Sequence, residues 1–220
     1  MIPLLLVLIA AISYFIGTIQ MARLLAATAI HKPIRKGGYV SYAAFDRMYG
    51  RKWLIALIAA DAAKTAVAVL IGGLLMLIPG DGFPVVGRLF AGMCVVIGDI
   101  HPYQTRLHGG HGVTCLMTAL CLADWRVGIV ALAALMIVVA ITQYMSLACV
   151  VGSLAGALAA WLFIEQAQMK GVAGLLAFVA FAFIAWSYRA NITRLIAKDG
   201  SEPKINWGRR PESRLRDEDF

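Results

Sequence analysis

Long apolar runs recur along the whole chain and restrict it to a helical membrane protein. One of the two longest, residues 53–78, contains only two charged residues, Asp61 and Lys64. A helix rises 1.5 Å per residue, so about 20 apolar residues span a hydrocarbon core of about 30 Å. With a mean hydropathy of +0.79 and only 15% charged residues, 220 residues are too apolar for a water-soluble domain.

Seven such runs predict an all-α, polytopic membrane protein with about seven transmembrane helices. The runs cover residues 2–27, 53–78, 84–97, 113–123, 127–141, 144–164 and 171–186. The first run lacks a small-residue cleavage site before a polar mature chain, so we interpret it as a retained helix rather than a signal peptide. Two runs, 84–97 and 113–123, are short for a bilayer, and we expect the loop between them to dip below the headgroups.

These runs and their loops predict one membrane domain over residues 1–190, with cytoplasmic loops at 31–52 and 98–112. A basic cytoplasmic tail follows over residues 191–220. Its arginines fit a polybasic segment against anionic lipid, and we expect its end to be disordered.

The distribution of basic residues predicts the orientation. With seven spans, fifteen of the 20 Lys and Arg residues fall on one side, in segments 27–52 and 98–112 and from residue 188 onward. The other side holds only Arg88, Arg126 and Lys170. The positive-inside rule then places the N-terminus outside and the C-terminus in the cytoplasm. This asymmetry explains the net charge of +8 without a nucleic-acid partner.

The loop 98–112, GDIHPYQTRLHGGHG, is where the sequence points to chemistry. It contains three of the four histidines and ends in Gly109-Gly110-His111-Gly112, directly before an apolar run. A glycine turn that opens a helix directs free N–H groups and the positive end of the helix dipole toward one point. We therefore predict that this loop handles a phosphate group at a membrane surface.

Motifs in several segments match the pattern of one known family. The loop resembles G-H-x-F-P…F-K-G-G-K-G-V-A-T, and residues 189–204 resemble R-x-N-I-x-R-L…G-x-E-x-K. Residues 34–50 are similar to I-R-K…G-S-G-N-x-G-A-T-N-V-L-R-x-L-G, residues 61–64 to D-x-x-K, and residues 144–147 to Y-V-S-L. Together, in order and spacing, they resemble the bacterial acyl-phosphate:glycerol-3-phosphate acyltransferases over nearly the whole chain.

Some motif positions depart from that family. Asp99 and Tyr188 stand where the family has histidines, and His108 and His111 stand where it has lysines. The serine–asparagine glycine loop is reduced to residues 37–41 and is about two residues shorter. The resemblance therefore implies a diverged member.

The implied reaction transfers a fatty acyl group from acyl phosphate to the 1-hydroxyl of glycerol 3-phosphate. It belongs to phospholipid synthesis at the cytoplasmic face of the bacterial inner membrane, next to membrane lipid and with no metal or other cofactor. The implied catalytic residues are His111, Arg47 and His108. The guanidinium of Arg47 suits two-point binding of a phosphate group, and the imidazole of His111 suits the role of a general base. The implied substrate-binding residues are Gly109, Gly110, Gly112, Asn191, Glu202, Arg194, Lys64, Ser146 and Asp99.

Other interpretations of these residues stay open. Asp61 and Lys64 lie three apart and fit a structural ion pair on one helix face. His108 and His111 fit a polar pair at the membrane surface. Two other functions also remain: a catalytically lost relative that binds lipid or a partner protein, and a transferase or hydrolase that uses the histidines on another phosphorylated lipid. A less favoured alternative is a metal set of Asp99, His101, His108 and His111.

Overall fold

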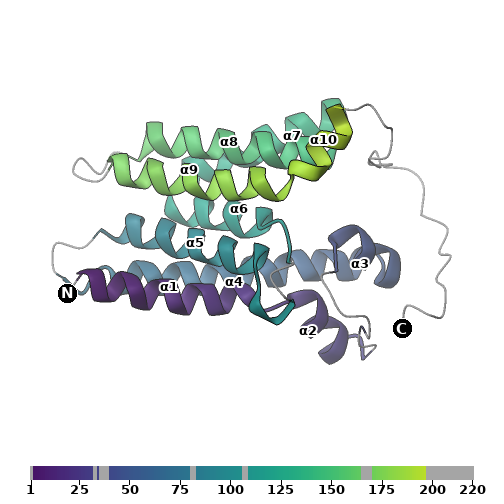
Figure 1. Cartoon of the computed structure of the whole chain (residues 1–220), viewed down its shortest axis with the longest axis horizontal. Helices are drawn as coiled ribbons and strands as arrows, with labels where there is room; N and C mark the ends of the chain where they lie inside the picture. The colour runs from purple at the N-terminus through teal and green to yellow at the C-terminus, as the bar shows by residue number, and fades with distance from the viewer. Residues whose placement is uncertain are drawn as a thin grey trace.

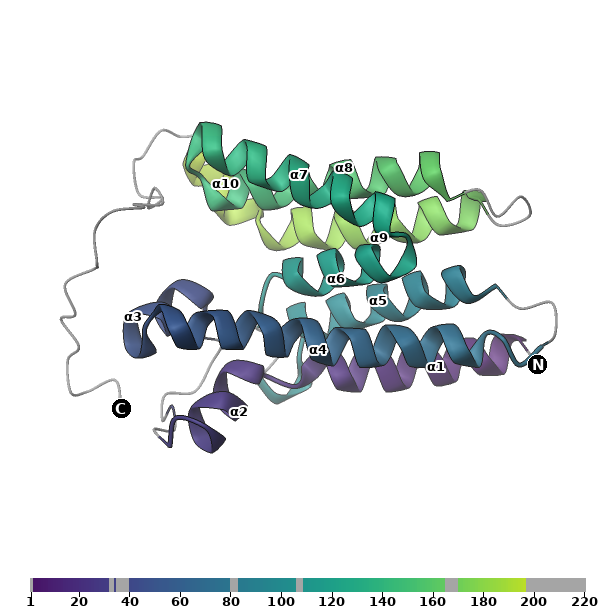
Figure 2. The ribbon, with the colours of Figure 1, turned by 180° about the vertical axis from the view of Figure 1, so that it is seen from behind.

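The computed structural model describes residues 2–31, 34, 40–79, 83–105, 109–164 and 170–196, and the regular elements among them are all helical. They form an elongated bundle whose long helices run up and down its length (Figure 1, Figure 2). The elements are α1 (Ile2–Thr18), α2 (Met21–Thr28), α3 (Tyr42–Tyr49), α4 (Arg51–Leu75), α5 (Pro84–Ile100), the 3₁₀ turn η1 (Tyr103–Thr105), α6 (Val113–Ala123), α7 (Trp125–Thr142), α8 (Met145–Phe163), α9 (Lys170–Ser187) and α10 (Arg189–Ile196).

Helix α5 joins the two halves of the bundle. It packs against α1 and α4 on one side and against α6 and α9 on the other. Helices α7, α8 and α9 form the second half, with α8 in contact with both neighbours, and α6 lies between the halves (Figure 1).

The helices bury small side chains and expose large apolar ones, the reverse of a water-soluble protein. All buried residues of α8 are Ser, Ala, Cys or Gly, whereas Leu162 on the same helix is 64% exposed. Leu4 and Ile141 are 76% and 78% exposed. Small residues let helix backbones approach closely, and lipid tails cover the large side chains. The packing is therefore that of a bundle in a bilayer.

Within the described residues, α4, α7 and α8 are each long and apolar enough to cross a membrane. Helices α1 and α2 form a fourth candidate, a pair bent by 51°. Helix α6 has 11 residues and at 1.5 Å per residue spans about 16 Å. It crosses only about half of a hydrocarbon core.

The predicted bounds of α4 to α9 agree with the structure within three residues. The single first helix expected over residues 2–27 is wrong, because the chain breaks after Thr18. Helix α5 also continues through Gly98 and Asp99 to Ile100, residues that were expected in the loop. Helices α3 and α10 form inside segments that were expected to be polar loop and tail.

The polar segments meet at one end of the bundle, opposite the N-terminus. Helices α2, α3 and α10 and the turn η1 all lie there (Figure 1, Figure 2). The described parts of segments 34–50, 98–112 and 189–204 therefore lie at one end of the molecule, and any site built from them lies there.

The substitution Gly98→Ala tests the close contact of α1 with α5. A Cβ on Gly98 would lie 2.5 Å from the carbonyl oxygen of Tyr14, so Gly98→Ala forces the helices apart. We expect a loss of about 1–3 kcal/mol in the free energy of unfolding, which thermal unfolding in detergent measures as a lower melting temperature.

Gly171→Ala on α9 is the matched control, because a Cβ there meets nothing within 4 Å. Both changes gain helix propensity, so their difference reports packing. Equal melting temperatures for the two variants would contradict the close α1–α5 contact.

Candidate active site

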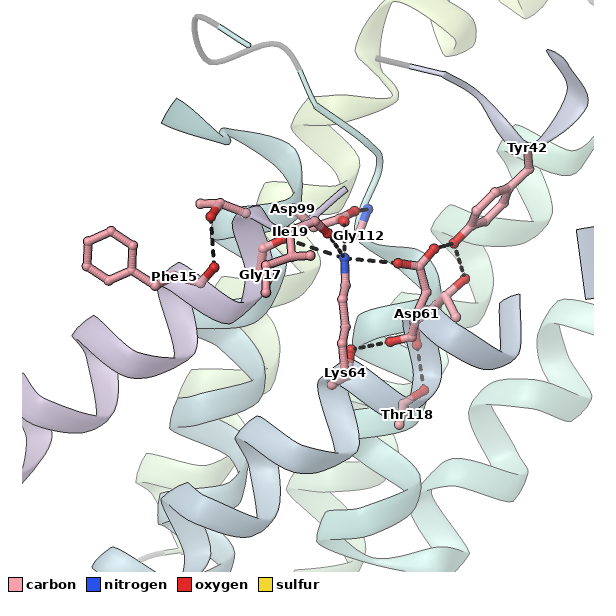
Figure 3. Close-up of polar contacts among 12 residues, drawn as sticks. Phe15, Gly17, Ile19, Tyr42, Asp61, Lys64, Asp99, Gly112 and Thr118 are labelled. Atoms are coloured by element: carbon pink, nitrogen blue, oxygen red, sulfur yellow. Dashed lines mark hydrogen bonds and ion pairs between the residues drawn. The ribbon is translucent and has the colours of Figure 1, made fainter. Parts of the chain in front are cut away.

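The ammonium group of Lys64 lies inside a cage of protein oxygens. Its Nζ is 2.9 Å from Asp61 Oδ1 and 3.0 Å from Asp99 Oδ1 (Figure 3). It also donates to the carbonyls of Ile19 at 3.0 Å and Gly17 at 3.5 Å. Lys64 is 5% exposed. The structural ion pair of Asp61 with Lys64 is confirmed, and this pair extends to Asp99 and to the backbone of α1.

The break after α1 supplies the two carbonyls. The last carbonyls of a helix have no partner within the helix and carry the negative end of its dipole. At the end of α1 the chain turns by 51° into α2, so these oxygens face α4 instead of a further helical turn. Lys64 then satisfies two of them, which explains how an apolar run can break inside the bundle.

Asp99 connects this cage to the glycine turn. Its Oδ2 accepts a hydrogen bond from the N–H of Gly112 at 3.2 Å, directly before α6 (Figure 3). Gly110 donates to the carbonyl of Asp99 at 2.8 Å, and Gly109 to that of Ile100 at 3.0 Å. Substrate binding by the three glycines stays a prediction. An anion at this turn has to compete with the Asp99 carboxylate for the Gly112 amide.

Gly112 itself has a φ of +71°, a conformation that side chains with a Cβ rarely adopt. This left-handed residue redirects the chain from the loop into α6. The glycine at this position is thus required by the turn that places His111 beside α9.

Tyr42, which the motifs did not single out, completes the cage. Its hydroxyl donates to Asp61 Oδ2 at 2.8 Å and lies 3.0 Å from Thr114 Oγ1 on α6. Burial, reinforced by the negative charge of Asp61, raises the pKa of Tyr42 far above its ordinary value, so the phenol stays protonated and donates. A small cavity of about 20 Å³, partly open to solvent, lies next to this network and is lined by Tyr42 and both carboxylates.

His111 contacts the junction of α9 and α10. Its Nδ1 is 2.7 Å from Ser187 Oγ, and its ring stacks on Tyr188 with centroids 4.0 Å apart and planes at 20°. Burial lowers the pKa of His111 below its ordinary value of 6.5. The imidazole is therefore neutral near pH 7, which suits a base better than a phosphate-binding cation. Sequence motifs did not single out Ser187; its place directly before the Y-R-A-N-I motif is the signal that could have found it.

The structure brings two more predicted residues together. Asn191 on α10 donates from Nδ2 to Ser146 Oγ on α8 at 3.3 Å. Ser146 is 5% exposed. This contact fixes α10 against α8, and substrate binding by either residue stays a prediction.

Arg47 is exposed in the last turn of α3, at the same end of the bundle. His108, Glu202 and the side chain of Arg194 lie outside the described residues. Among the described residues, no group of three His, Cys, Asp or Glu side chains is placed to hold a metal ion.

The fold is that of an integral membrane acyltransferase. It matches the crystal structure of PlsY (YgiH), an integral membrane glycerol 3-phosphate acyltransferase, in the glycerol 3-phosphate form, with a TM-score of 0.72 and 20% identity. The match covers 91% of this chain and 96% of that one. The lysophosphatidic acid form gives a TM-score of 0.73 at 21% identity.

Sequence comparison identifies the family. The glycerol-3-phosphate acyltransferase family model matches residues 7–198. The glycerol-3-phosphate acyltransferase of Thermoanaerobacter pseudethanolicus is 32% identical over 201 residues, 90% of this chain and 95% of the relative. That of Rhodospirillum rubrum is 33% identical over 196 residues, 87% of each chain. The chain belongs to this family, so the resemblance predicted from the motifs is confirmed and the chain is a membrane acyltransferase of phospholipid synthesis.

Lys64→Met tests whether the cage supports the fold. It leaves the buried Asp61 and the partly buried Asp99 without their counter-charge, and removing one partner of a buried ion pair costs about 3–5 kcal/mol. Tyr42→Phe keeps the ion pairs and removes one hydroxyl, with its contact to Thr114 and its hydrogen bond to the Asp61 carboxylate, worth about 1.5–3 kcal/mol. We expect thermal unfolding in detergent to rank wild type above Tyr42→Phe and Tyr42→Phe well above Lys64→Met. A Lys64→Met protein as stable as Tyr42→Phe would exclude a supporting role.

The lowered pKa of His111 predicts a pH-dependent stability. The unfolded chain binds a proton near pH 6.5 and the folded chain only at lower pH, so the contribution of neutral His111 is complete above about pH 6.5. It is lost as the pH falls through the pKa of the folded state. We expect the melting temperature to fall between about pH 7 and pH 5, and to fall less in His111→Gln.

His31→Gln serves as the control, since His31 is exposed. Its pH dependence should match the wild type. If His111→Gln also matches the wild type, His111 is not held neutral by burial.

Proposed function

We propose that the chain transfers a fatty acyl group from acyl phosphate to the 1-hydroxyl of glycerol 3-phosphate. One observation carries this assignment: the glycine turn before α6 and the R-A-N-I-T-R-L motif of α10 meet through His111, Ser187 and Tyr188. Two motifs about 75 residues apart in the sequence thus share one site at one end of the bundle.

The reacting groups follow from the chemistry of an acyl phosphate. This donor is already activated, so most of the task is to position two anionic substrates and remove one proton. The exposed guanidinium of Arg47 binds phosphate at the mouth of the site. The neutral imidazole of His111 takes the proton of the acceptor hydroxyl. Asn191 and Ser146 orient the glycerol hydroxyls.

We further propose seven spans with the site in the cytoplasm of a bacterium, at its inner membrane. Helices α1, α4, α5, α6, α7, α8 and α9 supply the spans, with α6 as a short one. The distribution of Lys and Arg supports this orientation, because the basic segments follow or precede the helix ends at the α2–α3–α10 end of the bundle.

The test is acyl transfer by the purified protein from palmitoyl phosphate to labelled glycerol 3-phosphate. We expect lysophosphatidate to form, and Arg47→Ala to lower kcat/KM by about 10- to 100-fold, the equivalent of one charge-assisted hydrogen bond of about 1.5–3 kcal/mol. The loss comes from the binding of a phosphate group that the guanidinium no longer contacts.

Arg126→Gln is the matched control and should leave kcat/KM unchanged, because Arg126 lies in the first turn of α7 and donates to the carbonyl of Phe163 at the end of α8. Folded protein that forms no product with these substrates contradicts the proposed reaction and favours a relative that binds lipid without turnover.

A further inference from the structure

Ser187, the last residue of α9, lies between two groups of the glycine turn. Its Oγ is 2.7 Å from Nδ1 of His111 and donates a hydrogen bond of 3.5 Å to the carbonyl of Gly110. A serine hydroxyl has one proton, and a backbone carbonyl can only accept. While Ser187 donates to Gly110, the short contact requires Nδ1 of His111 to carry a proton and donate to Oγ.

This arrangement determines which ring nitrogen is basic. A neutral imidazole has one protonated nitrogen and one with a free lone pair. We propose that Ser187 is a positioning residue that holds His111 as the Nδ1–H tautomer and so leaves Nε2 as the base for the acceptor hydroxyl. The inference rests on the proposed acyl transfer for its kinetic consequence, but not for the tautomer itself.

The next residue along the chain fixes the plane of the ring. Tyr188 is 7% exposed and stacks face to face on His111 at 4.0 Å. Ser187 thus contacts the ring edge while Tyr188 covers one face. A 180° ring flip would put Cδ2 in the place of Nδ1, and it would break the 2.7 Å contact. The described contacts of His111 therefore select one orientation as well as one tautomer.

The proposed step moves one proton and one acyl group. Nε2 accepts the proton of the acceptor 1-hydroxyl as that oxygen forms a bond to the acyl carbon. The bond from the acyl carbon to the phosphate oxygen breaks, and phosphate leaves with the electron pair. The imidazolium then returns its proton to the released phosphate. Ser187 keeps its own proton throughout and forms no covalent bond.

Kinetics of two variants test the role. Ser187→Ala removes the acceptor for Nδ1–H, and we expect kcat to fall about tenfold while KM changes by less than about twofold, because the loss equals about one hydrogen bond. Ser187→Thr retains a hydroxyl and should recover most of kcat. In a His111→Gln background, Ser187→Ala should have no further effect. An unchanged kcat in Ser187→Ala, or fully additive losses, would overturn the proposal.

A second measurement needs no turnover. With ¹⁵N-labelled histidine, His111→Gln identifies the His111 signals among those of the four histidines. We expect Nδ1 to be the protonated nitrogen in the wild type, and the Nε2–H form to increase in Ser187→Ala. An Nε2–H tautomer in the wild type overturns the inference. If the protein shows the Nδ1–H tautomer but catalyses no acyl transfer, the assignment of the tautomer to Ser187 stands. That result contradicts the proposed function instead.

The remaining alternative is that Ser187 is a nucleophile that takes up the acyl group. Mass spectrometry of the intact protein after incubation with palmitoyl phosphate tests this alternative. The positioning role predicts no added mass. A palmitoyl group found on Ser187 would make the serine a nucleophile and overturn the proposal.

Discussion

The Lys64 ammonium is the point on which this end of the bundle depends. It is a buried charge, and a buried charge is tolerated only with close counter-charges and hydrogen bonds. Here the oxygens come from the end of α1, from α4 itself and from α5. Tyr42 then ties α3 to the same carboxylates. The break after α1, the placement of α3 and the end of α5 therefore all depend on the same network around Lys64.

The same network determines what the glycine turn offers to a substrate. One carboxylate oxygen of Asp99 forms the ion pair with Lys64, and the other accepts the hydrogen bond of the Gly112 amide. A negative charge at the N-terminus of α6 is favourable, because it complements the helix dipole. The turn is thus held by the chain's own anion, and the group next to it, His111, is directed toward α9 and α10. In this chain the turn places the imidazole of His111 against Ser187 and Tyr188.

The sequence predicted the long helices because a bilayer imposes their length, so apolar runs and helix bounds agree for α4 to α9. It did not predict the break after Thr18, because residues 2–27 read as one apolar run and the stabilising lysine lies far away at position 64. The sequence did not predict helices α3 and α10 for a related reason. Short amphipathic helices contain no long apolar run and depend on contacts with their neighbours. Likewise, the motifs located His111 and Asn191, whereas Tyr42 and Ser187 belong to the site only through contacts distant in sequence.

Three of the departures from the family motifs lie close together in the structure. Asp99, His111 and Tyr188 stand where the family has histidine, lysine and histidine. In the structure they form one line of contacts: Asp99 binds Gly112, the residue after His111, and His111 stacks on Tyr188. Random loss of function would scatter substitutions without regard to contact. Substitutions that meet in one place, and that leave a neutral imidazole hydrogen-bonded and stacked, support the proposed role of His111 as a base in place of a fixed cation.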